Sequence, residues 1–261
     1  MIIKNGLVFN AEGRFEEKEV YVEDEKISKT GEGEIIDATG LYVIPGLTDI
    51  HFHACVGYDF CDGTKEAISK MAEYELKNGI TTICPASMTF SEEKLGQIFE
   101  TAKEYDGKDG AELVGINMEG PFISPQKKGA QAAENIMHCN YEYFCELQKA
   151  AHDLIKIVDI APEEPGAMNF IDKVKDNVVV SIAHTAADYD TAMEAIQHGV
   201  THATHLYNAM PPMNHRKPGV IGAIRDSYQC HAELICDGVH IHPSCVRATF
   251  EMSTDKRLVL I

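Results

Sequence analysis

The sequence lacks three features, each of which would point to a different class of protein. No apolar stretch approaches the roughly 20 residues that a membrane-spanning helix needs, so no membrane partner is expected. None of the eight cysteines belongs to a C-x-x-C pair, and the start, MIIKNGLVFN, does not have the charged-then-apolar order of a signal peptide. We therefore expect reduced thiols and a cytoplasmic location.

Positive charge is also scarce. The chain has 23 Lys and Arg residues against 41 Asp and Glu, which gives a formal net charge of −18. A field of that sign repels nucleic acid and anionic membrane surfaces, so neither is expected as a partner. An anionic small molecule would have to be held by a local cluster of hydrogen-bond donors.

The sequence does have a regular order of strand-like and helix-like segments, and 261 residues suffice for a large buried core. Residues 1–42 hold short strand-like pieces divided by turn residues and predict a small β element. From 43 to 261, strand-like runs alternate with helical stretches such as Ser91–Tyr105, Tyr141–His152 and Asp188–His198. Eight such strands, the last being RLVLI, predict an α/β fold of the (β/α)₈ TIM-like barrel type, with a doubly wound open sheet as the alternative.

Polar side chains at the ends of different strands favour the barrel. Barrel enzymes build their sites at the carboxyl ends of the strands, because each strand can deliver one side chain toward a common centre. The residues found at such ends are His51, His53, Glu119, His184, His205 and Asp237 or His240.

Two short motifs suggest ligands for a metal ion. His51 and His53 are two apart, so on a strand they project to one side while Phe52 faces the other. Two imidazoles on one side can bind one divalent ion, although two surface histidines would explain the pair equally well. Glu119 ends a strand directly before Gly120, where a carboxylate is poorly explained as a core residue; a solvated loop acid is the alternative.

Two further histidines follow apolar strands. His184 ends the most apolar strand, where it is either a satisfied core group or a ligand. His202 and His205 are three apart and are predicted to face opposite sides of a strand, so we choose His205 as the inward one and regard His202 as structural. With Glu119, the two chosen histidines would complete one metal site, and the H-x-H pair would supply a second. Such ligands suit Zn, Fe(II), Co or Mn without choosing among them, and an ion there would activate water and polarise a carbonyl.

Several motifs give the chain a recognisable character. VIPGLTDIHFH, MEGPFIS, AHT, THLYNAMPP and DGVH resemble the N-acetylglucosamine-6-phosphate deacetylases of the amidohydrolase superfamily, and the resemblance runs to Ile261. It implies a barrel, here 43–261, that carries a small β-sandwich, of which 1–42 would be the N-terminal part. It also implies hydrolysis of N-acetylglucosamine 6-phosphate to glucosamine 6-phosphate and acetate, a step of amino-sugar catabolism.

The resemblance assigns the metal ligands residue by residue. Glu119, His184 and His205 would bind the principal divalent ion. In members that keep the H-x-H pair, as this chain does, His51 and His53 hold a second ion, and Glu119 is placed to bridge the two.

The resemblance also assigns the residues that would bind substrate. The phosphate would be held by the backbone of Asn208 and Ala209, by His240, and by Arg216 from a neighbouring subunit, which implies a homodimer with shared sites. Arg216 suits a phosphate because its planar fork of donors matches the oxygens. Gln131 stands where many relatives have a histidine that contacts the sugar, so that contact is expected in altered form.

One departure from the family pattern concerns the chemistry. The family's general acid/base is an aspartate at the tip of strand eight, expected just after Ile261, so no catalytic acid/base is assigned within 1–261. The eighth helix and the C-terminal sandwich strands would also follow, and we expect this sequence to be an incomplete portion of a longer enzyme. Two alternatives remain: another amidohydrolase that acts on a cyclic amide or nucleobase, or an inactive fragment that binds metal or sugar phosphate.

Overall fold

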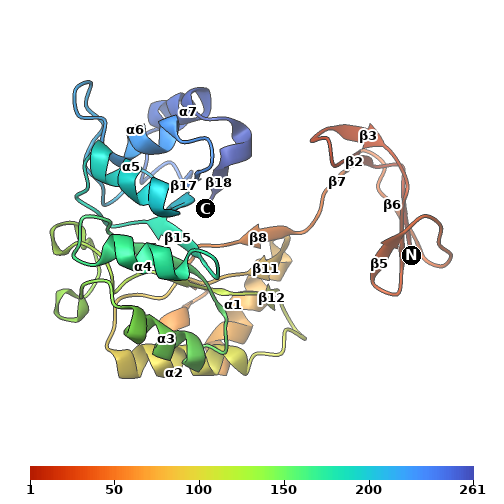
Figure 1. Cartoon of the computed structure of the whole chain (residues 1–261). Coiled ribbons are helices and arrows are strands. Elements are labelled where there is room, and N and C mark those ends of the chain that lie inside the picture. Colours follow the sequence, from red (N-terminus) through yellow and green to blue (C-terminus); the bar gives the residue numbers. More distant parts are fainter. The chain divides into compact units, whose positions relative to one another are not determined.

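The chain forms two compact units, Met1–Leu47 and Thr48–Ile261, each of which is described by itself. The computed structural model describes residues 1–261, apart from the side chain of residue 255. The first unit has two small sheets, with strand orders β5-β4-β1-β6 and β3-β2-β7 (Figure 1). Its strands are β1 (Ile2–Lys4), β2 (Leu7–Phe9), β3 (Phe15–Glu17), β4 (Val20–Glu23), β5 (Lys26–Ser28), β6 (Ile35–Asp37) and β7 (Tyr42–Val43).

The second unit is built on a parallel sheet. Its strands are β8 (Leu47–Asp49), β11 (Ile80–Ile83), β12 (Glu112–Leu113), β13 (Ile116–Met118), β14 (Ile155–Ile160), β15 (Val179–Ile182), β16 (His202–Ala203), β17 (His231–Leu234) and β18 (Leu258–Leu260). The order is β12-β11-β8 in one ladder and β13 to β18 in sequence in the other, and a parallel bridge between Ala86 and Asn117 joins the two. Because β12 and β13 are two pieces of one strand position, the sheet has the eight positions of a (β/α)₈ barrel, and the predicted fold class is confirmed.

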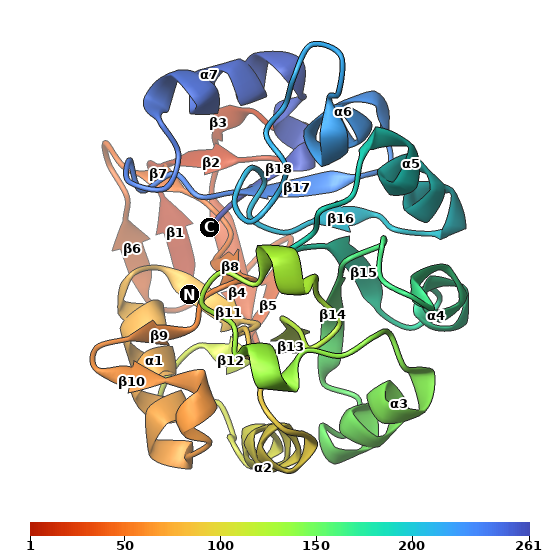
Figure 2. The ribbon, with the colours of Figure 1, turned by 90° about the vertical axis from the view of Figure 1, so that its left-hand side faces the viewer.

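Helices connect successive strands and form a ring outside them (Figure 2). They are α1 (Lys65–Lys77), α2 (Glu92–Lys103), α3 (Tyr141–Ala150), α4 (Ala167–Val174), α5 (Tyr189–His198), α6 (Gly219–Asp226) and α7 (Pro243–Met252). The hairpin of β9 (Ala54–Cys55) and β10 (Tyr58–Asp59) and the 3₁₀ turns Phe60–Asp62, Pro125–Lys127, Ala133–Asn135 and Asp255–Arg257 complete the unit. Among the helices described, none has the length and apolar character needed to cross a bilayer.

Side-chain caps explain where several helices begin. Ser91 accepts a hydrogen bond from Lys94 N at the start of α2, and Asp188 accepts one from Thr191 N at the start of α5. Such caps satisfy backbone N–H groups that have no partner within the helix. The three helices predicted from the sequence are therefore present, with Ser91 as the expected N-cap.

Alternation along the strands separates two environments. Val158, Ile160, Val180 and Ile182 belong to the apolar core that packs against the helices. The residues between them face the other way and are polar. We call this buried set the interior polar layer; it consists of Asn117, Asp159, Ser181, His202 and Glu233.

Candidate functional site

A cavity of about 490 Å³ lies where the strands of the second unit end. Its lining includes nearly every site residue that the sequence predicts; Arg216 is the exception. The lining residues are His51, His53, Met88, Glu119, Gly129, Ala130, Gln131, His184, His205, Asn208, Ala209, Ile235, His240 and Ile261.

Glu119 is the centre of this cavity and is almost completely buried. Its Oε1 atom lies 2.9 Å from His184 Nε2 and 3.0 Å from His205 Nε2, and the two nitrogens are 3.2 Å apart. In a tetrahedral site with bonds of about 2.0–2.1 Å, neighbouring ligand atoms lie roughly 3.3 Å apart. The three atoms therefore have the mutual spacing of ligands that share one ion.

A hydrogen bond to the outer ring nitrogen of His184 determines which of its two nitrogens presents a lone pair to Glu119. His184 Nδ1 lies 2.8 Å from the carbonyl oxygen of Lys127, and a carbonyl can only accept, so Nδ1 carries the proton. A neutral His184 then presents an unprotonated Nε2 to the carboxylate. Lone pairs this close repel one another unless a cation lies between them, and this is how histidine ligands of metals are usually oriented.

The H-x-H pair approaches Glu119 from the other side. His53 Nε2 lies 3.1 Å from Glu119 Oε2, and His53 Nδ1 lies 3.2 Å from the carbonyl of Ala86, which again leaves Nε2 as the inward lone pair. His51 Nε2 is 4.0 Å from Glu119 Oε1. Two groups of donors thus meet at Glu119, each with its ligand atoms within 4.8 Å of one another: His51, His53 and Glu119, and Glu119, His184 and His205.

Burial and charge act in opposite directions on these groups. Burial alone would raise the pKa of Glu119, but the close imidazoles of His184, His205 and His53 hold it well below its usual range. Burial would likewise lower the pKa of His51, yet its hydrogen bond to the carboxylate of Glu233 raises that pKa to about 9. The cavity therefore keeps a carboxylate ionised among imidazoles, which is a suitable environment for a divalent cation.

The backbone of His184 and His205 adopts a conformation that is rare for residues other than glycine. His184 and His205 have φ values of +42° and +34°, both in the left-handed region. Gly129, at φ +56°, forms the wall beside them, and a Cβ atom at this position would lie 3.3 Å from His184 Cε1. Glycine at 129 thus leaves room for the imidazole.

The prediction that His202 and His205 face opposite sides is wrong. Strand β16 ends at Ala203, and His205 follows it with left-handed φ, so strand alternation does not extend to it. Both side chains turn toward the interior: His202 Nε2 lies 3.8 Å from Glu233 Oε1, and His205 Nε2 lies 3.0 Å from Glu119 Oε1. His202 nevertheless lies in the interior polar layer rather than at Glu119, with Nδ1 2.9 Å from Ser181 Oγ.

Sequence reasoning missed Glu233. This residue lies on β17 and is fully buried, and its Oε2 atom is 2.7 Å from His51 Nδ1. Asp159, another buried acid, has its Oδ1 bonded by Thr204 Oγ1 at 2.8 Å, and burial raises its pKa well above the usual range. The signal that could have found both is a single carboxylate inside an otherwise apolar barrel strand.

The residues predicted to bind substrate occupy different surroundings. Gln131 is buried, with Nε2 donating to Glu119 Oε2 at 3.0 Å and Oε1 accepting from Thr89 N at 2.6 Å. His240 is held at the cavity by Asp237, whose carboxylate lies 2.7 Å from His240 Nδ1. Hydrogen bonds from the backbone N–H groups that follow Asp237 lower its pKa to about 2.

Arg216 does not reach the cavity in a single copy of the chain. It is exposed, its backbone N donates to Asn214 Oδ1 at 3.0 Å, and it lines a separate hollow beside Asp188 and Pro218. The cavity of this chain is therefore formed without an arginine from the described part of the same chain.

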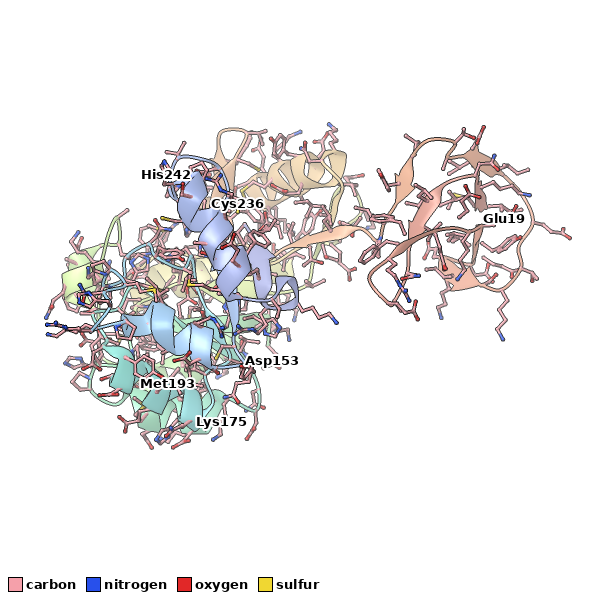
Figure 3. All side chains as sticks on the ribbon, turned by 90° about the horizontal axis from the view of Figure 1, so that it is seen from above. Glu19, Asp153, Lys175, Met193, Cys236 and His242 are labelled. Atoms are coloured by element: carbon pink, nitrogen blue, oxygen red, sulfur yellow. The ribbon has the colours of Figure 1, made fainter. Side chains whose placement is uncertain are left out.

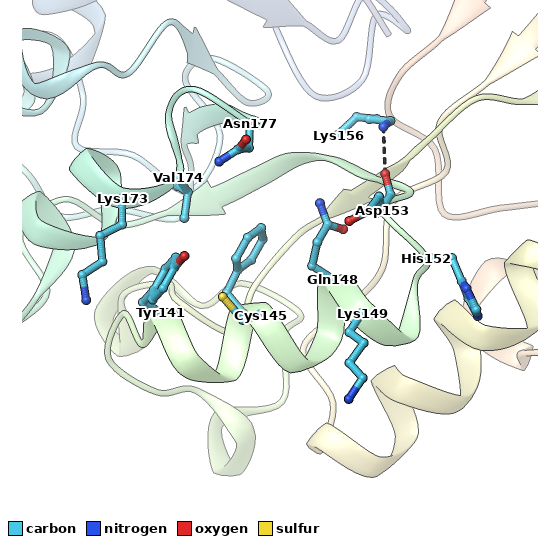
Figure 4. Close-up of a pocket in the computed structure, with 11 residues that line it drawn as sticks. Tyr141, Cys145, Gln148, Lys149, His152, Asp153, Lys156, Lys173, Val174 and Asn177 are labelled. Carbon is cyan, nitrogen blue, oxygen red and sulfur yellow. Dashed lines mark hydrogen bonds between the residues drawn. The ribbon is translucent and has the colours of Figure 1, made fainter.

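A hollow of about 810 Å³ between α3 and α4 is larger than the cavity at Glu119 but has no comparable convergence of groups (Figure 4). Three lysines line it, yet Lys156 Nζ is already bonded to the carbonyl of Asp153 at 2.7 Å, and Lys173 lies over the ring of Tyr141. Size alone does not identify a site, and the donor atoms that converge are those around Glu119.

Comparisons with known proteins agree with this geometry. The profile of the Amidohydrolase family matches residues 42–259. N-acetylglucosamine-6-phosphate deacetylase of Bacillus subtilis (strain 168) is 36% identical to this chain, and the match covers 100% of the chain and 66% of the relative. The chain thus spans slightly less than two thirds of that protein's length.

Solved structures give the same result. That of N-acetylglucosamine-6-phosphate deacetylase from Pasteurella multocida has a TM-score of 0.90 and 30% identity, covering 100% of this chain and 70% of its own. A variant of the Mycobacterium smegmatis enzyme, in complex with N-acetyl-D-glucosamine-6-phosphate, has a TM-score of 0.91 and 25% identity with the same coverage. The resemblance predicted from the motifs is confirmed: the chain belongs to the amidohydrolase family, among relatives that are N-acetylglucosamine-6-phosphate deacetylases.

Proposed function

We propose that this chain provides the metal centre of a hydrolase that converts N-acetylglucosamine 6-phosphate to glucosamine 6-phosphate and acetate. The observation that carries the proposal is the meeting of Glu119 Oε1, His184 Nε2 and His205 Nε2 within 3.2 Å of one another. Lone pairs at this spacing repel one another unless a cation lies between them, so the arrangement favours the binding of a cation. A relative in complex with N-acetyl-D-glucosamine-6-phosphate supports the substrate.

In this proposal the two groups of donors hold two divalent ions. Glu119, His184 and His205 would bind the first, and His51 and His53 would bind the second, with the two oxygens of Glu119 shared between them. A divalent ion at such a site lowers the pKa of water toward 7 and polarises a carbonyl, which is the chemistry that amide hydrolysis requires. Nitrogen and oxygen ligands of this kind accept Zn, Fe(II), Co and Mn.

The chain's own residues would orient the sugar phosphate. A net charge of −18 repels the phosphate, so donors at the cavity must hold it locally. Asn208 and Ala209, which follow β16, and His240 line the cavity and are proposed for this role. The hydrogen bond to Asp237 keeps the imidazole of His240 in place.

Gln131 is proposed as a sugar contact. Its amide nitrogen donates one hydrogen bond to Glu119 and its oxygen accepts from Thr89. The second N–H of Gln131 Nε2 would donate to a sugar hydroxyl, so one side chain would contact both the substrate and the carboxylate.

Two further parts of the proposal concern groups outside the cavity. Arg216 is exposed and lies away from the cavity, so an arginine contact to the phosphate would have to come from a second copy of the chain in a homodimer. The general acid/base is proposed to be an aspartate directly after Ile261, since Ile261 lines the cavity. A cytoplasmic location suits a phosphorylated sugar and reduced thiols.

The experiment is acetate release from N-acetylglucosamine 6-phosphate by the Zn-loaded chain, with and without the C-terminal part of the Bacillus subtilis relative fused after Ile261. The proposal is supported if the fused protein releases acetate and its Glu119→Gln variant does not. Hydrolysis of dihydroorotate or adenosine instead would assign another amidohydrolase reaction. If the chain and the fused protein both bind ions stoichiometrically but neither releases acetate, the proposed catalytic activity is contradicted.

A further inference from the structure

The carboxylate of Glu233 contacts both groups of donors at once. Glu233 Oε2 lies 2.7 Å from His51 Nδ1 and accepts a hydrogen bond from the backbone N of His205 at 3.1 Å. His51 belongs to one group around Glu119, and His205 belongs to the other. Glu233 itself is too far inside the strand layer to line the cavity, so it touches the ligands only from behind.

The two contacts differ in kind. At His51 the carboxylate accepts from ring nitrogen Nδ1, which fixes the orientation of the ring and points Nε2 toward Glu119. At His205 it holds the backbone at the point where β16 has ended and φ is left-handed. Loss of Glu233 should therefore affect the ion site of His51 by releasing the imidazole ring. It should affect the ion site of His205 by releasing the backbone at that residue.

Asp159 provides a comparison within the same interior polar layer. It is as fully buried as Glu233, but its carboxylate accepts a hydrogen bond from Thr204 rather than from any of the candidate ligands. Burial and the nearby charges of Glu119 and Glu233 raise the pKa of Asp159 well above its usual range. An asparagine at 159 would keep the size of this side chain and remove its carboxylate.

We infer that Glu233 is a positioning residue that links the two ion sites, by orienting His51 for one and anchoring the backbone of His205 for the other. The inference rests on the proposed ion centre. Supporting carboxylates behind histidine ligands typically change metal affinity by about 10- to 100-fold when they are altered. The larger effect should fall on the site of His51 and His53, because there the contact is made to the ligand ring.

The test is titration of the ion-free chain with Co(II), followed by visible absorption and elemental analysis, for the wild type, Glu233→Gln and Asp159→Asn. The wild type should bind two ions. Glu233→Gln should keep the first with an affinity within about threefold and bind the second about 10- to 100-fold more weakly. Asp159→Asn should match the wild type at both sites.

Each other outcome separates the inference from the function on which it rests. If the wild type binds no ion, the proposed ion centre fails. If the wild type binds two ions and Glu233→Gln does the same with unchanged affinity, or if Asp159→Asn weakens the second ion equally, the role of Glu233 is overturned.

A second measurement does not require the variant to fold. In the Zn-loaded wild type labelled with ¹⁵N-histidine, His51 should show a strongly downfield, exchange-protected Nδ1 proton, because that proton is held by a buried carboxylate. Coordination of Zn through His51 Nδ1 would remove this resonance and overturn the inference.

Discussion

His184 Nε2 and His205 Nε2 lie 3.2 Å apart and face the same oxygen of Glu119. Neither ring gains from this arrangement by itself, since two imidazole nitrogens and a carboxylate oxygen at such distances repel when all three carry lone pairs. A cation converts the repulsion into three favourable bonds. Ligand binding stabilises a fold by about 2.7 kcal/mol at a hundredfold excess over Kd, so ions should raise the free energy of unfolding of this chain.

Glu119→Gln should remove most ion binding, because the shared carboxylate supplies the negative charge of both sites. We expect less than one ion per chain after dialysis against excess Zn and about 100-fold weaker binding in competition with a chelator. The matched control is Glu75→Gln, which alters a buried acid on α1 that does not line the cavity. Equal ion content in the Glu119 variant and the control would contradict the assignment.

Gly129→Ala should weaken ion binding through contact with His184. Alanine at φ +56° is strained, and its Cβ would lie 3.3 Å from His184 Cε1, which displaces the ring. Gly57→Ala is the control, because Gly57 has φ +86° but open space around the new Cβ. Each variant should lose roughly 1 kcal/mol of unfolding free energy. Only Gly129→Ala should lower Zn affinity in a chelator competition, and a similar loss in both would show that strain alone is responsible.

Phe170→Ala should destabilise the second unit. Phe170 is buried with ring centroids 5.0 Å from Phe122 and 5.6 Å from Phe144, so it ties α4 to α3 and to the segment after Glu119. Removing a buried phenylalanine costs about 3–5 kcal/mol. Phe250→Ala, at an exposed position of α7, should change the unfolding free energy by less than about 1 kcal/mol in urea denaturation. If Phe170→Ala and Phe250→Ala lose similar amounts of unfolding free energy, the contacts of Phe170 with Phe122 and Phe144 do not stabilise the packing of α3 and α4.

The sequence predicted the strand order and the positions of three helices, because periodicity and caps such as Ser91 are local signals. It also named residues that the structure brings together around Glu119. The carboxyl ends of barrel strands can be located in the sequence, and the side chains there converge on a common centre whatever the conformation of the loops.

The parts that could not be predicted depend on conformation beyond the strands. That His202 and His205 both face the interior follows from the left-handed conformation of His205 after a two-residue strand, which no alternation rule contains. The roles of Glu233 and Asp159 could not be predicted, because a carboxylate within a strand does not indicate which residue it contacts. Their partners, His51 and Thr204, come from distant parts of the chain.

The eight cysteines should divide into reactive and protected thiols. Burial raises the pKa of Cys61, Cys84 and Cys139 from the ordinary value of 9 to about 12. A rise of three units leaves about a thousandfold less thiolate at pH 8, and only the thiolate attacks alkylating reagents. Cys236 and Cys245 are exposed, and Cys236 lies beside α7 (Figure 3).

Iodoacetamide at pH 8 should therefore modify Cys236 and Cys245 first, as read by mass spectrometry of the digested chain. Raising the pH from 7 to 9 should speed the reaction of Cys236, because more thiolate forms as pH approaches its pKa from below. The buried thiols should stay unmodified over this range and react only once urea unfolds the chain. Early modification of Cys84 in the folded protein would show that the sheet around it opens, since both its burial and its raised pKa protect it.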